Sequence, residues 1–221
     1  NTKNYTHLSM NIEEHPFSSE NYLEYAKEVR EYADSIGIIC NQAHAPFPSS
    51  VGDPQKDEEI FNSIIRSMEM ASILGAEIIV VHPKQHLEYA DNVDELFRLN
   101  VEFYNRLIPY CEKYNIQVAT ENMWQYNQAS GAITDSTCSR AWEFNKYIDS
   151  LNSKWITGCL DLGHASLVTK DISQFIKDMG NKRINALHVH DTNLHNDSHT
   201  IPFLESMDYI TIAKTLGEID Y

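Results

Sequence analysis

Residues 157–167, TGCLDLGHASL, have the apolar composition of a buried strand, yet they contain Asp161, Gly163 and His164. A buried carboxylate destabilises a protein by several kcal/mol unless it is paired with a positive charge or binds a metal. Asp161 therefore needs a partner at the end of this strand. We expect Gly163 to let the chain bend, so that His164 faces the same site.

Helical and strand-like segments alternate along the chain on both sides of this stretch. Apolar residues at helical spacing predict helices over 19–37, 57–75, 93–115, 139–152, 171–180 and 207–219. Short apolar runs predict strands over 38–47, 76–83, 116–122, 155–165 and 184–193. This alternation, without hairpin signals, indicates parallel βαβ units whose strands are covered on both faces. The sequence thus predicts an α/β fold, either an open doubly wound sheet or most of a (β/α)₈ barrel.

A polar residue stands at the carboxyl end of every predicted strand, and these ends are about one βα unit apart: His44, His82, Glu121, Asp161 and His188. In a barrel, the carboxyl ends of the strands meet at one mouth, where catalytic side chains from different strands converge. The shared position of these five residues favours the barrel over the open sheet.

Strand alternation supports this convergence. His82 shares a face with Ile78 and Val80, Glu121 shares one with Gln117 and Ala119, and His188 shares one with His190. Imidazoles and carboxylates grouped in this way suit a divalent transition-metal ion or a small cluster. Two alternatives to metal binding remain for these residues. Glu121 could form a buried ion pair with an arginine or lysine, and each histidine could have a structural role as a hydrogen-bonded residue.

Composition limits the class of protein. The chain has 221 residues, 42% of them hydrophobic, and no apolar run approaches the length of a membrane helix or of a signal peptide core. The cysteines are scattered, which favours reduced thiols. A net charge of −15 disfavours nucleic acid as the main partner. We expect one domain over 1–221, located in the cytoplasm. We expect its partners to be a small ligand or a cation rather than a membrane, and the sequence is compatible with a homo-oligomer.

Six short motifs occur in a fixed order: HAPF (44–47), VVHP (80–83), TEN (120–122), CLDLGH (159–164), ALHVHD (186–191) and DSHTIPF (197–203). With these motifs the chain resembles, from about residue 38 to its end, the xylose-isomerase-like TIM barrel superfamily. That superfamily holds sugar-phosphate isomerases and epimerases together with AP endonucleases of the endonuclease IV type. The resemblance implies a (β/α)₈ barrel in which strand 1 and strand 8 are absent from this sequence. Since a barrel without two strands exposes sheet edges, we expect the natural protein to be longer. The last metal ligand of the superfamily, a glutamate at the end of strand 8, is not in this sequence.

The resemblance also implies the ligands of a divalent metal ion, Mn, Zn, Co or Mg. Glu121, Asp161 and His188 match the ligands that isomerases and nucleases of this superfamily share. The remaining ligands of the zinc nucleases match His44, His82, His164, Asp197 and His199. Residues 202–205 read Pro-Phe-Leu-Glu instead of the Pro-Gly-Glu-Gly of many epimerases, so phosphate contacts of that loop are not carried over.

The function that the resemblance implies is a metal-dependent isomerase or epimerase of a sugar or sugar phosphate, acting through an enediolate. Glu121 would bind the metal and move the proton, and His164 would orient a substrate hydroxyl. Further substrate contacts are expected from His44, His82, Trp124 and His190, with Trp124 either forming a wall against the sugar or packing over the barrel mouth. Two alternatives stay open: a zinc-dependent AP endonuclease, and a barrel that binds metal or sugar without catalysis.

Overall fold

The computed structural model describes residue 17, residues 19–169 and residues 171–221 of the chain. Its main feature is a sheet of five parallel strands, in the order β1, β2, β3, β6, β7. These strands are β1 (Gln42–His44), β2 (Ile78–Val80), β3 (Gln117–Glu121), β6 (Ile156–Asp161) and β7 (Ile184–His188). The fold is an α/β half-barrel, which confirms the α/β class that the alternating pattern predicted and the barrel that the polar strand ends favoured. Residues 1–16, expected to follow strand 1 of the barrel, lie outside the described residues.

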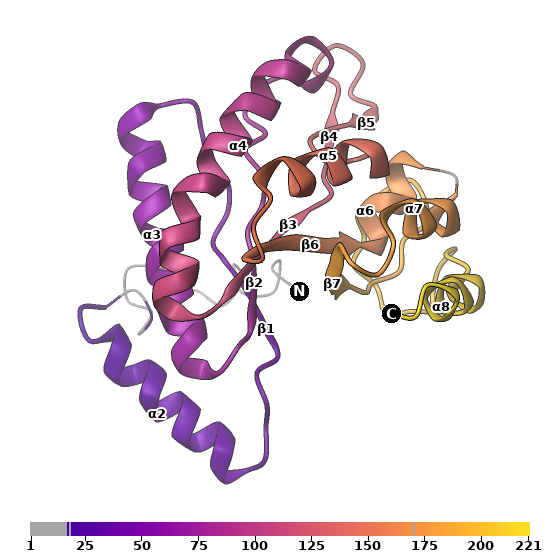
Figure 1. Cartoon of the computed structure of the whole chain (residues 1–221). Helices are drawn as coiled ribbons and strands as arrows, with labels where there is room; N and C mark the ends of the chain where they lie inside the picture. Colours follow the sequence, from indigo (N-terminus) through magenta and orange to yellow (C-terminus); the bar gives the residue numbers. More distant parts are fainter. Residues whose placement is uncertain (1–16, 18, 170) are drawn as a thin grey trace.

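Helices connect successive strands and cover the outside of the sheet (Figure 1). They are α2 (Tyr22–Ser35), α3 (Pro54–Leu74), α4 (Tyr89–Tyr114), α5 (Ala141–Leu151), α6 (Leu162–Val168), α7 (Ile172–Met179) and α8 (Tyr209–Glu218). Figure 1 shows α3 and α4 side by side along β1, β2 and β3, whereas α7 and α8 lie near β7. None of the helices in the described part of the chain is both long and apolar enough to cross a membrane.

Local sequence explains where α3 begins and ends. The Asp53 carboxylate accepts hydrogen bonds from the backbone of Gln55 and Lys56, and Pro54 occupies the first turn, where its missing N–H is not needed. At the other end, Gly75 adopts a left-handed conformation with φ of 87°, which glycine adopts without steric cost. The chain then enters β2 at Ile78, so the end of α3 fixes where that strand begins.

Two apolar cores flank the sheet, and a small one lies inside it. One core joins α3 and α4 to the first strands, with Ile64, Met68 and Leu107 fully buried. A second core joins α5, α7 and α8 to β6 and β7. The inner core holds Val80, Ala119, Cys159 and Ala186, one from each of four strands. These inner residues share strand parity with the polar residues at the strand ends, so the predicted inward face is confirmed.

Two features of the chain between the strands differ from the prediction. Residues 124–135 contain an antiparallel hairpin, β4 (Trp124–Tyr126) with β5 (Ile133–Asp135), although no hairpin was predicted. The turn depends on Asn127, whose side chain accepts from the backbone of Ala129 and Ser130. The strand predicted over 155–165 stops at Asp161, because that side chain caps a helix that begins at Leu162. The four cysteines are all unpaired, as expected.

Candidate metal and substrate site

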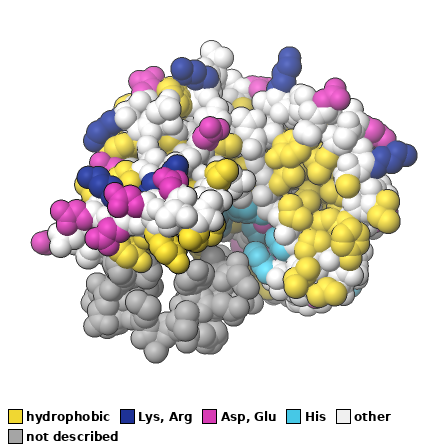
Figure 2. Space-filling view, turned by 90° about the horizontal axis from the view of Figure 1, so that it is seen from below, with side chains coloured by type: hydrophobic (Ala, Val, Ile, Leu, Met, Phe, Trp, Pro, Cys, Tyr) yellow, Lys and Arg dark blue, Asp and Glu magenta, His cyan; other side chains and the backbone are white. Residues whose placement is uncertain are grey.

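The carboxyl ends of the parallel strands bring the predicted polar residues together. His44, Glu121, Asp161 and His188 are the last residues of their strands, and His82 lies two residues beyond β2. Glu121 pairs with Cys159 in the register, and Asp161 pairs with His188. The site therefore lies directly above the inner core, and Figure 2 shows histidine side chains in a hollow of the surface.

Glu121 is the centre of the cluster, and its side chain is 1% exposed. Four imidazoles surround it: His188 Nδ1 and His164 Nδ1 lie 3.0 and 3.4 Å from Oε1, and His82 Nε2 and His44 Nε2 lie 3.0 and 3.4 Å from Oε2. Every ion-pair partner of this carboxylate within the described residues is a histidine. The alternative of a buried pair with arginine or lysine is therefore excluded for that part of the chain.

Asp161 has partners on both oxygens. Oδ1 accepts a hydrogen bond from the backbone of His164 at 2.7 Å, which caps helix α6, and it also lies 2.9 Å from His190 Nε2. Oδ2 lies 3.1 Å from His190 Nε2 and 3.4 Å from His188 Nδ1. The buried carboxylate thus faces two imidazoles and a helix N-terminus, an arrangement that favours its charged form.

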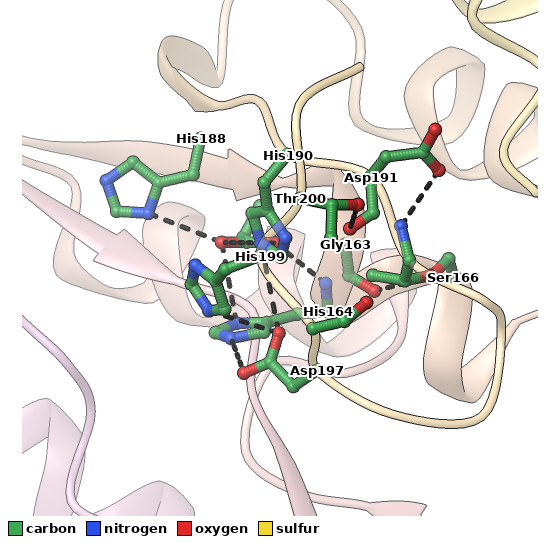
Figure 3. Close-up of polar contacts among 12 residues, drawn as sticks. Gly163, His164, Ser166, His188, His190, Asp191, Asp197, His199 and Thr200 are labelled. Carbon is green, nitrogen blue, oxygen red and sulfur yellow. Dashed lines mark hydrogen bonds and ion pairs between the residues drawn. The ribbon is translucent and has the colours of Figure 1, made fainter. Parts of the chain in front are cut away.

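A second group of ligand-type side chains comes from the loop that follows β7 (Figure 3). Asp197 Oδ1 lies 3.1 Å from His199 Nε2, and Asp197 Oδ2 lies 3.5 Å from His164 Nε2. His199 stacks on His190 with ring centroids 3.8 Å apart. Since His164 also contacts Glu121, its ring joins this second group to the first.

Asp191 holds that loop in place. The residue is 0% exposed, and its carboxylate accepts backbone hydrogen bonds from Thr192, Glu205 and Met207 at 2.8, 2.9 and 3.0 Å. The backbone of Asp191 also pairs with Thr200 as an isolated antiparallel bridge. One buried side chain therefore closes the segment that presents Asp197 and His199 to the site (Figure 3).

The surroundings shift the pKa values of the cluster. Burial opposes ionisation of Glu121, but the imidazoles of His188, His44 and His82 outweigh it and hold the Glu121 pKa well below its usual range. For His164, burial is outweighed by the charges of Asp161, Asp197 and Glu121, which raise its pKa to about 10. Burial lowers the pKa of His82. Without a metal, ionised carboxylates therefore surround a protonated His164.

The donor set fits a divalent cation. Three groups of side chains have ligand atoms close enough to share an ion: His44 with Glu121 and His188; Glu121 with Asp161 and His164; and His164 with His190, Asp197 and His199. Glu121 Oε2, Asp197 Oδ1 and His190 Nδ1 are buried atoms that make no hydrogen bond of normal geometry, although histidine nitrogens lie 3.0 and 3.1 Å from the two oxygens. Unsatisfied buried acceptors are rare in proteins, and an ion would satisfy these.

Residues predicted to contact substrate have different environments. The His44 side chain is 29% exposed, whereas those of His82 and His190 are 12% and 9% exposed. His190 bonds Asp161, so its placement favours a role in holding that carboxylate; its contact with substrate stays a prediction. Trp124 lies on the hairpin, where its ring makes a T-shaped contact with that of Tyr126, with centroids 4.9 Å apart.

Phe47 and Asn122 are two residues of the site to which the sequence assigned no role. Phe47 stacks on His82 with centroids 4.8 Å apart, contacts the ring of His44 edge-on, and is 49% exposed. Its position after His44 in the HAPF motif was the available signal. Asn122 is buried between Glu121 and Asp161, and in the sequence it appears only as the last letter of TEN.

The half-barrel with its polar strand ends defines this protein as one of the TIM barrel class. The chain belongs to the xylose isomerase-like TIM barrel family, which it matches over residues 5–221. Among solved structures, it is similar to a D-tagatose 3-epimerase-like protein, with a TM-score of 0.77 and 24% identity over 92% of this chain and 76% of that one. It is also similar to a D-psicose 3-epimerase, with a TM-score of 0.73 and 16% identity over 94% of this chain and 69% of that one.

Curated relatives are similarly distant in sequence. A probable endonuclease 4 of Listeria monocytogenes is 24% identical over 97% of this chain and 74% of its own length. An uncharacterised protein of Sinorhizobium fredii is 24% identical over 70% of this chain. The chain spans 47% of the length of that second relative.

Proposed function

We propose that this protein is a divalent-metal-dependent isomerase or epimerase of a sugar or sugar phosphate. The observation that carries the proposal is the buried Glu121 carboxylate, ringed by four imidazoles at the strand ends and with Oε2 making no hydrogen bond of normal geometry. The epimerases among the structures of similar fold support this class of substrate. Which sugar is used, and whether it is phosphorylated, depends on the loops over the site.

Glu121, Asp161 and His188 would hold the ion, with His44 close enough to complete its coordination. His164 lies beside this ion site, with Nε2 facing Asp197 in the second group of ligand-type side chains. A bound divalent ion would polarise the carbonyl and hydroxyl oxygens of the sugar, so that charge developing on them is stabilised. These residues come from four strands of the sheet and the start of α6, so the packed strand ends fix their spacing.

Glu121 is also the group that we assign to proton transfer. Its low pKa keeps it ionised, so it can accept a proton from the carbon next to the sugar carbonyl. Returning that proton to the neighbouring carbon of the enediolate gives the isomer, whereas inversion at the first carbon would require a second acid on the opposite face. His164 lies between Glu121 and Asp197 and would orient a substrate hydroxyl. Trp124 and the partly exposed Phe47 would provide apolar surface for the sugar ring.

Substrate-proton exchange tests this assignment directly. The protein is incubated in D₂O with Mn²⁺, Co²⁺, Mg²⁺ or Zn²⁺ and a panel of aldoses, ketoses and their phosphates, and deuterium incorporation is followed by NMR. Glu121→Gln should lose both exchange and isomerisation. Glu143→Gln is the matched control, because Glu143 is also 1% exposed but lies on α5, outside the strand-end cluster. Exchange at the wild-type rate in Glu121→Gln would refute the assignment.

A zinc-dependent endonuclease is the second candidate. Two observations favour it: the similarity to the Listeria endonuclease over 97% of the chain, and the second ligand group of His164, His190, Asp197 and His199. The net charge of −15 opposes binding to a phosphate backbone. A zinc cluster in the purified protein, together with cleavage of DNA at abasic sites, would support the nuclease; a single ion without cleavage would support the isomerase.

A further inference from the structure

Asn122 lies where the two carboxylate-bearing strands separate. The β3–β6 ladder ends at the pair of Glu121 with Cys159. Beyond it, the chain after β3 leaves towards the hairpin, where Met123 N–H donates to Thr137 O, and the chain after β6 turns into α6. Backbone pairing between the two strands therefore stops before it reaches Asp161.

The Asn122 side chain continues the ladder across this gap. Its Oδ1 accepts the backbone N–H of Asp161 at 2.7 Å, and its Nδ2 donates to the backbone carbonyl of Asp161 at 2.9 Å. A side-chain amide carries the same donor and acceptor as a peptide group, so it can substitute for one backbone rung. The residue is 0% exposed, so both hydrogen bonds are shielded from water.

The backbone of Asn122 also orients His164. Its carbonyl oxygen lies 2.9 Å from His164 Nδ1. A carbonyl only accepts hydrogen bonds, so this contact places the proton on Nδ1 and leaves Nε2, 3.5 Å from Asp197, as the ligand atom. Asn122 therefore contacts two candidate ligands and is bonded in sequence to a third, Glu121.

We propose that Asn122 is a positioning residue that sets the spacing of Glu121, Asp161 and His164 for metal binding. The inference rests on the proposed function, since it presupposes that these side chains hold an ion. Residues that orient metal ligands without touching the metal typically change its affinity by about 10–100-fold. A buried asparagine with a purely structural role would change stability without a selective effect on the metal.

Asn100 provides a matched control. It too is 0% exposed, and its amide makes the same reciprocal pair with the backbone of one residue, accepting from Lys84 N at 2.6 Å and donating to Lys84 O at 2.9 Å. Its side chain contacts neither carboxylate of the site. Asn100→Ala therefore removes an equivalent clamp from the loop after β2 and leaves the separation of β3 and β6 unchanged.

The experiment compares wild type, Asn122→Ala and Asn100→Ala in the full chain. Affinity for Co²⁺ and Zn²⁺ is measured by competition with a chelator, the absorption spectrum of bound Co²⁺ reports coordination geometry, and urea unfolding of the metal-free protein reports stability. Both variants should lose stability. The metal affinity of Asn122→Ala should be at least about tenfold lower than that of wild type, and its Co²⁺ spectrum should change. The metal affinity of Asn100→Ala should stay within about threefold of the wild-type value.

Equal metal affinities of the two variants would overturn the role of Asn122. A wild-type chain that binds neither ion would overturn the proposed function and this inference with it, so the two failures are distinguishable. The tautomer of His164 in the zinc-loaded wild type is a further test that needs no variant. Long-range ¹H–¹⁵N NMR should show a proton on Nδ1, and zinc on Nδ1 would contradict the proposal.

Discussion

Replacing Gly163 by alanine tests how strongly Asp161 depends on the His190 ring. Gly163 is the second residue of α6, and a methyl group there would lie 2.5 Å from Nε2 and 2.6 Å from Nδ1 of His190. These separations are far below van der Waals contact, so the imidazole must move. It is held by Asp161 at 2.9 Å and by stacking on His199. The substitution should therefore break the contact between His190 and Asp161.

The expected loss of stability follows from three terms. Losing a hydrogen bond to a buried carboxylate costs about 1.5–3 kcal/mol, and overpacking a well-filled site costs about 1–3 kcal/mol. Alanine recovers about 1 kcal/mol of helix propensity relative to glycine. The net destabilisation of the metal-free protein should be about 1.5–5 kcal/mol, measured by urea unfolding.

A double-mutant cycle isolates the cause. In the His190→Ala background the imidazole is gone, so Gly163→Ala should be neutral or stabilise the protein by up to about 1 kcal/mol. The coupling free energy between the two positions then equals the cost of the single variant or exceeds it by up to about 1 kcal/mol. Equal destabilisation by Gly163→Ala in both backgrounds would show that the clash with His190 is not the cause, and would refute the reasoning.

Three other predictions concern different parts of the molecule. Burial raises the pKa of Glu143 to about 7, so the folded state holds this proton more tightly than the unfolded state and stability falls as pH rises from about 4.5 to about 7. The free energy of unfolding of Glu143→Gln, measured in urea, should therefore equal that of wild type near pH 4.5 and be about 3 kcal/mol higher near pH 8. Asp191→Asn replaces a triple acceptor with a group that has only one acceptor oxygen, and it should speed amide hydrogen exchange in the loop over 192–207. Asp208→Asn, at the exposed cap of α8, is its control and should leave that loop unchanged. Saturating metal at about 100 times its dissociation constant should stabilise the protein by about 2.7 kcal/mol, seen as a thermal shift of about 5–10 °C that a chelator reverses.

The fold was predictable because its signal is periodic. Each strand is an apolar run that ends in a polar residue, and this repeat indicates both the parallel sheet and the convergence of His44, Glu121 and His188 at one mouth. The hairpin over 124–135 has only a weak sequence signal, since each of its strands is three residues long and the loop between them is longer than the two-residue turns that mark most hairpins. Its turn depends on the local hydrogen bonds of Asn127, which have no periodic signature.

The candidate site was only partly predictable. Residue type and strand phase identified the ligand-type side chains, but the contacts between them depend on tertiary register. The pairing of His190 with Asp161, the stacking of Phe47 on His82 and the amide clamp of Asn122 all join residues distant in sequence. In the sequence, Asn122 resembles any polar residue after a strand. Its amide finds its two backbone partners only because β3 separates from β6 at this point.

Asp161 has two roles that selection can maintain independently: it is a candidate metal ligand, and its side chain caps helix α6. Because Oδ1 caps helix α6 through the backbone of His164, a relative that had stopped binding metal would still lose helix stability on replacing it. Conservation of this aspartate is therefore weak evidence of activity within the family. Glu121 has no such second role, since within the described residues its carboxylate contacts only imidazoles. Selection against a buried, unneeded charge would remove it first, so Glu121 is the position that should separate metal-binding members of the family from inactive ones.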